Sequence, residues 1–190
     1  MGTRHLTIVV KDEKVRVAQY GQWDGYPDYT GKGILEILRG DLDNIINGLD
    51  NCLWVDDGIL ENMLKHVEEV SKTSLEGNWM TLEQSEVYHD LYPEQHRSTG
   101  YKILKMVADS QIPLYLANSF EFAADPIFCE WAYVIDLDNG KFETYSNRGE
   151  GGQGIFARLG EDTVGMVASY DLDELPSEEE YMQQFIQEDE

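Results

Sequence analysis

The chain has 190 residues, a formal net charge of −23 and a hydrophobic share of 42%. That length favours one domain, and that hydrophobic share is enough for a core. Binding to a nucleic-acid backbone or to an anionic membrane requires a basic face, and 14 basic against 37 acidic residues argue against both. Acidity of this kind serves solubility, or it imitates nucleic acid on the basic surface of a partner protein.

The cysteines and the first residues of the chain indicate in which cellular compartment the protein works and whether it binds a metal. The two cysteines, Cys52 and Cys129, are far apart and form neither a zinc pattern nor a disulfide framework. We expect free, buried thiols in a reducing compartment, with no metal and no other cofactor. The start of the chain has no apolar run typical of a signal peptide, and no transmembrane segment is expected. These features predict a cytoplasmic protein.

The first elements in chain order are two β-branched runs. Residues 4–10 (RHLTIVV) are typical of a strand, 11–13 of a polar turn, and 14–20 (KVRVAQY) of a second, alternating strand. Together they predict a β-hairpin. A loop rich in aromatic residues then continues to Thr30.

The region 31–111 has the periodicity of helices. An apolar stripe predicts a helix that begins at TGKG (30–33) and ends at Gly40, followed by a second short helix over 41–51 with Asp41 as its cap. A third helix is predicted over 56–72. Further helical turns are expected over 81–92 and 99–110.

The last part of the chain returns to strands. A buried strand is expected within 112–118, and alternating runs on both sides of Asn139-Gly140 predict a hairpin with a type I′ turn. A hairpin fits 136–143 (DLDNGKFE) better than a calcium loop does, because Gly140 stands where a ligand is needed. The glycine-rich stretch 149–154 predicts a loop that leads into a strand at 155–159. A capping box formed by Ser177 and Glu180 predicts the terminal helix.

This order of elements predicts one α+β domain over 1–190. It comprises the N-terminal hairpin (4–20), a helical region (31–111), C-terminal strands (112–170) and a terminal helix (177–187). Because strands gather at both ends of the chain and tight turns join them, we expect a largely antiparallel sheet with the central helices packed on it. The strand at 129–133 should lie beside the N-terminal hairpin, since an isolated hairpin is marginally stable.

The stretch 18–27 (AQYGQWDGYP) is the best candidate for a ligand site. Its aromatic side chains lie in a loop at a strand end, and the following TGKG could offer free N–H groups and close approach to an anion. Such an arrangement suits a nucleotide-like or sugar-like ligand. The alternative is an aromatic mini-core with Arg4 stacked or ion-paired. The residues expected to bind the ligand are Arg4, His5, Tyr20, Gln22, Trp23, Asp24, Tyr26, Gly31, Lys32 and Gly33.

Three segments carry a resemblance to a known family. GTRHLTIVV (2–10), VAQYGQWDGYP (17–27) and CEWAYVIDLDNGKFETY (129–145) together resemble an uncharacterised family of bacteriophages, prophages and some fungal genomes. The resemblance implies a cytoplasmic accessory protein that acts on a host pathway, and it assigns no catalytic role to any residue.

Three hypotheses of function follow from these features. The first is a protein that binds and sequesters a small anionic ligand, nucleotide-like or sugar-like. The second is a hydrolase with His5 as general base and Asp24 as its orienting or acidic partner, assisted by Tyr20 or Cys129. The third is an acidic interaction module that blocks a basic partner, such as a host protein. Neither a metal site nor contact with nucleic acid is part of any of them.

Overall fold

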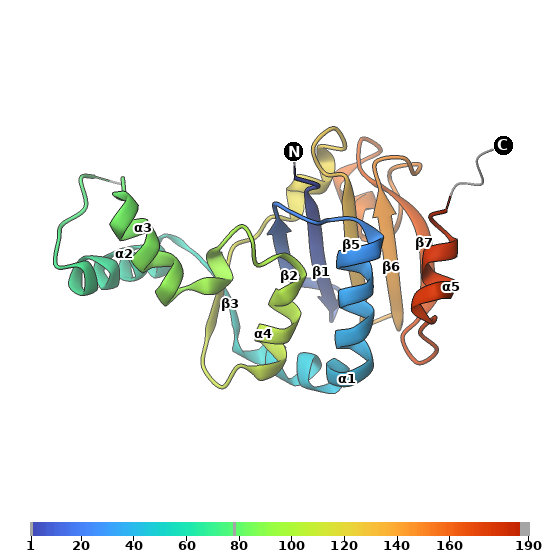
Figure 1. The fold of residues 1–190 in the computed structure, drawn as a ribbon, viewed down its shortest axis with the longest axis horizontal. Coiled ribbons are helices and arrows are strands. Elements are labelled where there is room, and N and C mark those ends of the chain that lie inside the picture. The colour runs from blue at the N-terminus through green and yellow to red at the C-terminus, as the bar shows by residue number, and fades with distance from the viewer. Residues whose placement is uncertain (1, 78, 187–190) are drawn as a thin grey trace.

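The structure, a computed structural model, describes residues 2–77 and 79–186 and is built on a five-stranded sheet in the order β2-β1-β5-β6-β7 (Figure 1). The central pair, β1 and β5, is parallel and the other pairs are antiparallel. The predicted α+β class with a largely antiparallel sheet is therefore confirmed. The strands are β1 (His5–Lys11), β2 (Lys14–Gly21), β5 (Trp131–Asp136), β6 (Lys141–Ser146) and β7 (Gly165–Asp171).

The register of β1 determines which side chains face each side of the sheet. His5 pairs with Gly21 on β2 and with Trp131 on β5, which confirms that the strand near 129–133 lies beside the N-terminal hairpin. Successive side chains of a strand point to opposite faces. Leu6 and Ile8 accordingly enter one core, whereas Val9 enters the other.

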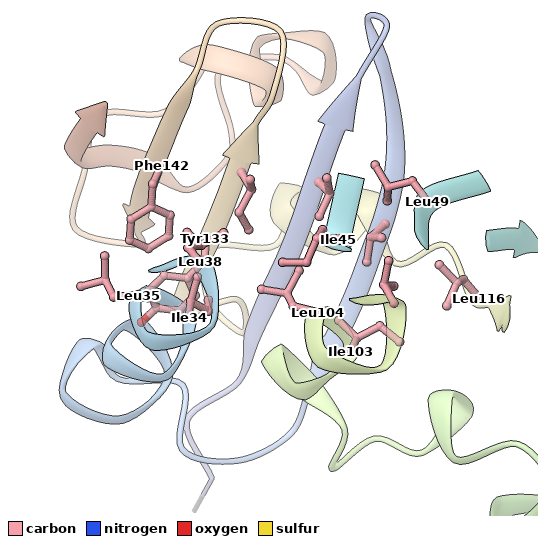
Figure 2. Packing of buried hydrophobic residues seen from close by; sticks show 14 of the residues in the cluster. Ile34, Leu35, Leu38, Ile45, Leu49, Ile103, Leu104, Leu116, Tyr133 and Phe142 are labelled. Carbon is pink, nitrogen blue, oxygen red and sulfur yellow. The ribbon is translucent and has the colours of Figure 1, made fainter. Parts of the chain in front are cut away.

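Helices α1 (Lys32–Gly48) and α4 (Ile103–Asp109) cover one face of the sheet (Figure 2). Their apolar side chains recur at helical spacing and pack on Tyr133 and Phe142 of the sheet. The helices can approach closely because Gly48 of α1 faces the backbone of Val107, where a Cβ would collide. The buried side chains from this helical layer are Ile34, Leu35, Leu38, Ile45, Leu49, Ile103, Leu104 and Val107.

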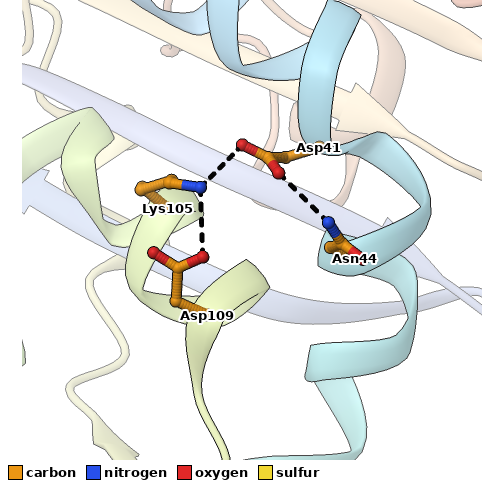
Figure 3. A network of polar contacts seen from close by, with 4 residues as sticks. All are labelled: Asp41, Asn44, Lys105 and Asp109. Atoms are coloured by element: carbon orange, nitrogen blue, oxygen red, sulfur yellow. Dashed lines mark hydrogen bonds and ion pairs between the residues drawn. The ribbon is translucent and has the colours of Figure 1, made fainter.

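Helix α1 continues through Gly40, so the predicted break there and the separate helix over 41–51 are wrong. A helical glycine costs only about 1 kcal/mol. The apolar residues on both sides of it pack in one core, which outweighs that cost. Asp41 is not a cap. Instead it binds the Lys105 ammonium at 2.9 Å, and Lys105 also binds Asp109 at 3.0 Å, so these groups link α1 to α4 (Figure 3).

The other face of the sheet is covered by two 3₁₀ helices, η5 (Phe120–Ala124) and η6 (Gly154–Leu159). The strand expected at 155–159 is therefore wrong. Gly154 and Gly160 bound this segment with φ values of 53° and 101°, which break an extended chain. Phe156 packs edge-on against Tyr145 at 4.8 Å, and the last strand, β7, comes later.

The type I′ turn is found in the first hairpin and not in the second. Asp12 and Glu13 link β1 to β2 with φ values of 57° and 59°, as a type I′ turn requires. The Asp138 carboxylate accepts both of their N–H groups, each at 2.7 Å. In the β5–β6 loop only Gly140 of the Asn139-Gly140 pair has a positive φ, so the predicted type I′ turn there is wrong.

Residues between α1 and α4 form an arm that extends away from the sheet (Figure 1). Short parallel strands β3 (Cys52–Trp54) and β4 (Leu114–Leu116) pair at its base. The arm itself consists of α2 (Asp57–Ser71), which confirms the helix predicted at 56–72, and α3 (Leu82–Leu91). Its buried apolar side chains are Met63, Val67 and Tyr88.

The terminal helix α5 (Glu178–Gln183) begins at the predicted capping box of Ser177 and Glu180. Tyr181 of this helix is buried, and its hydroxyl lies 2.9 Å from that of Thr144 on β6. Residue 187, the predicted end of the helix, lies outside the described residues. In the described part of the chain, no helix combines the length and apolar character needed to cross a bilayer.

Candidate functional site

A cavity of about 190 Å³, the His5 pocket, lies where β1 begins. The loop after β2 forms one wall, and the π-helical turn η1 (Pro27–Gly31) forms the second. Residues 98–102, which include the 3₁₀ turn η4 (Gly100–Lys102), form the third. Its lining residues are His5, Gly21, Gln22, Trp23, Asp24, Tyr29, Thr30, Ser98, Thr99, Gly100, Tyr101 and Lys102.

His5 is buried, with 2% of its surface exposed, yet neither ring nitrogen has a hydrogen-bond partner among the described residues. Burial lowers its pKa from the ordinary value of 6.5 to about 4, and the Thr3 backbone, which approaches the ring without forming a well-aligned hydrogen bond, opposes this shift only in part. The ring is therefore neutral at pH 7 and offers one donor and one acceptor. A buried polar group without a partner costs stability, so a ligand that supplied one would gain that energy.

Glycines make the space for the His5 ring. A Cβ at Gly21 would collide with the ring, and a Cβ at Gly100 would stand 2.8 Å from Nε2. Gly100 also has a φ of 47°, a conformation that side chains disfavour. On the third side, a Cβ at Gly25 would lie 2.9 Å from Nδ1. The imidazole is thus enclosed by backbone on three sides, and His5 is one of the residues that line the pocket.

The loop over the pocket is held in a strained form. Asp24 has a φ of 55°, which is uncommon for a residue other than glycine. The Thr30 hydroxyl donates to its carbonyl at 2.6 Å, and the buried Tyr133 hydroxyl donates to the Gly25 carbonyl at 2.7 Å. Such strain persists only where the surroundings impose it, and it is common at ligand sites.

Aromatic and hydroxyl side chains form the rim. Trp23 and Tyr29 are about half exposed, at 46% and 50%, and Tyr29 meets Tyr101 edge-on at 6.0 Å. Lys102 is the cation and Asp24 the carboxylate of the lining, which is otherwise neutral. Aromatic faces beside a few placed polar groups suit a small polar molecule with a flat or ring-shaped body.

Four of the predicted ligand residues, His5, Gln22, Trp23 and Asp24, come together in this pocket. Tyr26 does not line this pocket but a separate cavity on the other side of η1. The other five predicted residues also lie outside the pocket, in two groups.

Arg4 and Tyr20 lie on the opposite side of the sheet. The Arg4 guanidinium stands 4.6 Å from the centre of the Phe128 ring, and Tyr20 packs edge-on against Phe122 at 5.1 Å. The expectation that they converge with His5 is wrong, because neighbouring positions of a strand face opposite ways. Tyr20 is close to the pocket only through its hydroxyl, which donates to Gln22 at 2.6 Å.

The predicted anion cradle at 30–33 is absent. The turn η1 runs directly into α1, so the Lys32 N–H is bonded to the Pro27 carbonyl and is not free. Tyr181 fills the space beside Gly31, and Tyr101 fills the space beside Gly33. The Lys32 ammonium instead lies 3.8 Å from a Glu178 carboxylate oxygen.

The wall at 98–102 is missing from the sequence prediction. These residues are far from the first hairpin in the chain, and nothing local indicates that they meet it. The one local signal is Gly100, which follows Ser98 and Thr99 and takes the left-handed conformation. The Gln22 N–H donates to the Arg97 carbonyl at 2.9 Å and joins the two segments.

Of the groups in the hydrolase hypothesis, His5 and Asp24 line the same pocket, but they do not form a catalytic pair. No hydrogen bond joins Asp24 to His5, since both ring nitrogens are unpartnered. Burial raises the pKa of the Cys129 thiol, which lies in the core opposite His5 and donates to the Trp131 carbonyl at 3.5 Å. Across residues 2–77 and 79–186, no three His, Cys, Asp or Glu side chains gather as metal ligands.

Comparison of the chain with protein-family models, with curated proteins and with solved structures finds no match.

Proposed function

We propose that this protein binds a small polar molecule in the His5 pocket. The observation that carries the proposal is the buried, neutral imidazole without a partner at the base of an open cavity. Native proteins leave few buried polar groups unpaired, and each exception calls for an explanation. A bound ligand that forms a hydrogen bond with one of the ring nitrogens would supply part of that explanation.

The size and lining of the pocket support a sugar-like ligand. Its volume of about 190 Å³ is below the range of about 300–1,000 Å³ typical of drug-sized ligands. A monosaccharide, or the sugar end of a nucleotide, is of suitable size. Trp23 would stack on the sugar ring, Asp24 would accept from hydroxyls, and Lys102 would bind a phosphate or carboxylate group.

The alternatives have less support. A histidine whose pKa lies near 4 is a weak general base at neutral pH, and no carboxylate orients it. The acidic-module hypothesis rests on net charge alone. A role in sequestering a host molecule, as the resemblance to a phage family implies, would follow from ligand binding and needs no catalytic group.

The proposal is tested by thermal shift and calorimetry with monosaccharides, sugar phosphates and nucleoside monophosphates. At a ligand concentration of 100 times the Kd, the stabilisation should be about 2.7 kcal/mol. We expect His5→Phe, which removes both ring nitrogens, to abolish it.

His89→Phe is the matched control. His89 also has a buried ring nitrogen without a partner, but it lies on α3, outside the pocket. The His89→Phe substitution should leave the stabilisation by ligand unchanged. No response to any member of the panel, or an equal response in His5→Phe, would contradict the proposal.

A further inference from the structure

A second and larger cavity, the Trp131 pocket, lies on the other side of η1 and has a volume of about 570 Å³. Tyr26 and Asp28 line it from the loop and η1, and Trp131 lines it from the start of β5. The remaining walls come from the end of β6 and the turn after it, from Val167 on β7, and from α5 and the residues after it. Its volume falls within the range of sites for drug-sized ligands.

Aromatic rings line one side of this pocket. Phe185 meets Trp131 edge-on, with 5.6 Å between the ring centres, and Tyr26 is half exposed at its mouth. Met182 adds a flexible apolar side chain to the same lining. A planar apolar group could pack here against ring faces and edges.

Arg148 supplies a cation to the lining. It is exposed, and none of the ion pairs among the described residues includes it. Its own N–H donates to the Ser146 hydroxyl at 3.2 Å, which orders the turn that carries it. A guanidinium without a protein carboxylate, in a chain of net charge −23, is available to bind an anion.

We propose that the Trp131 pocket binds a planar aromatic anion. The ring system packs against Trp131, Phe185 and Met182, and its carboxylate, sulfonate or phosphate group binds the Arg148 guanidinium. Asp28, the carboxylate in the lining, accepts from a donor on the ligand and excludes a second anionic group. This site takes a different class of ligand from the His5 pocket and does not depend on it.

Two fluorescent probes test the proposal: the anion 8-anilinonaphthalene-1-sulfonate and its neutral analogue N-phenyl-1-naphthylamine. We expect saturable binding of both. Arg148→Gln should weaken binding of the anion about tenfold, the effect of one charge-assisted bond, and leave the neutral probe unchanged. Phe185→Ala should weaken the binding of both probes. Trp131→Phe should reduce energy transfer from tryptophan to the bound anion.

Arg158→Gln is the matched control for charge, because Arg158 is bonded to the Glu13 carbonyl by the β1–β2 turn, on another part of the molecule. It should leave both affinities unchanged, and so should His5→Phe, which separates this proposal from that for the His5 pocket. Equal anion binding in Arg148→Gln, unchanged binding in Phe185→Ala, or no saturable binding of either probe would overturn the proposal.

Discussion

His5 shows how one residue links stability to ligand binding. Its neutral ring fits the folded protein, where burial holds the pKa at about 4, whereas the unfolded chain binds a proton near pH 6.5. The unfolded state therefore binds more protons than the folded state between these values, and acid favours unfolding. The contribution of the neutral His5 ring to the free energy of unfolding is fully present above pH 6.5 and is lost as pH falls toward 4.

The prediction is that His5→Phe removes this pH dependence. Relative to that variant, the wild type should lose about 3 kcal/mol of its free energy of unfolding between pH 7 and pH 4. The steepest loss should be about 1.4 kcal/mol for each pH unit. Urea unfolding of both proteins at several pH values measures it. Carboxylates titrate in both proteins and cancel in the difference. A difference that does not change with pH would show that His5 is not held neutral by burial.

At the scale of elements, the β1–β2 turn depends on a side chain from another hairpin. Asp12 and Glu13 take left-handed conformations, which cost about 1–2 kcal/mol per residue. The Asp138 carboxylate offsets part of that cost through its two bonds of 2.7 Å to their N–H groups.

We expect Asp138→Ala to lower the free energy of unfolding by about 1 kcal/mol, as loss of a helix cap does. Glu13→Gly should restore part of it, because glycine adopts a positive φ freely. Chemical unfolding of Asp138→Ala, of Glu13→Gly and of the variant that carries both substitutions measures this effect. Asp173→Ala, at an exposed aspartate, should have no such effect. Equal losses in Asp138→Ala and Asp173→Ala would mean that charge, and not these bonds, is responsible.

The α2–α3 arm should open locally before the rest of the molecule unfolds. Its buried core consists of Met63, Val67 and Tyr88, whereas α1 packs against both α4 and the sheet. Segments with few buried apolar contacts open at a lower free energy than the core. Amide hydrogen exchange should be much faster in α2 and α3 than in α1. Met63→Ala should speed exchange further in the arm and leave α1 unchanged, and equal protection of α1 and α2 in the wild type would contradict this prediction.

For the whole molecule, the sequence predicted the sheet better than the site. The alternation in β1 and β2 and the polar turn between them were enough to place the first hairpin, and the need for more strands placed β5 beside it. The same alternation separates His5 from Arg4 and Tyr20, so the division of the predicted site between two faces could also have been read from the sequence. That step was missing from the prediction.

Other features depend on contacts that no local pattern shows. Gly40 stays helical because of the core beneath α1, and Ile155 and Phe156 lie in a 3₁₀ helix between glycines despite their strand-like composition. The wall at 98–102 lies beside His5 through contacts between distant segments, such as the packing of α4 on α1 and the bond from the Gln22 N–H to the Arg97 carbonyl. Tertiary packing decides these cases over local preference.

The net charge of −23 leads to a last prediction, that salt stabilises the protein. With 37 acidic and 14 basic residues, most carboxylates have no cation to pair with, and like charges repel in the compact state. The ion pairs between described residues are few and mostly exposed, so screening removes more repulsion than attraction. Raising NaCl from 0.05 to 0.5 M shortens the screening distance to several ångströms and should raise the Tm by about 2–4 °C. Choline chloride should act equally, because the effect is ionic strength and not binding of sodium. A Tm that falls with either salt would show that attractive pairs dominate the surface.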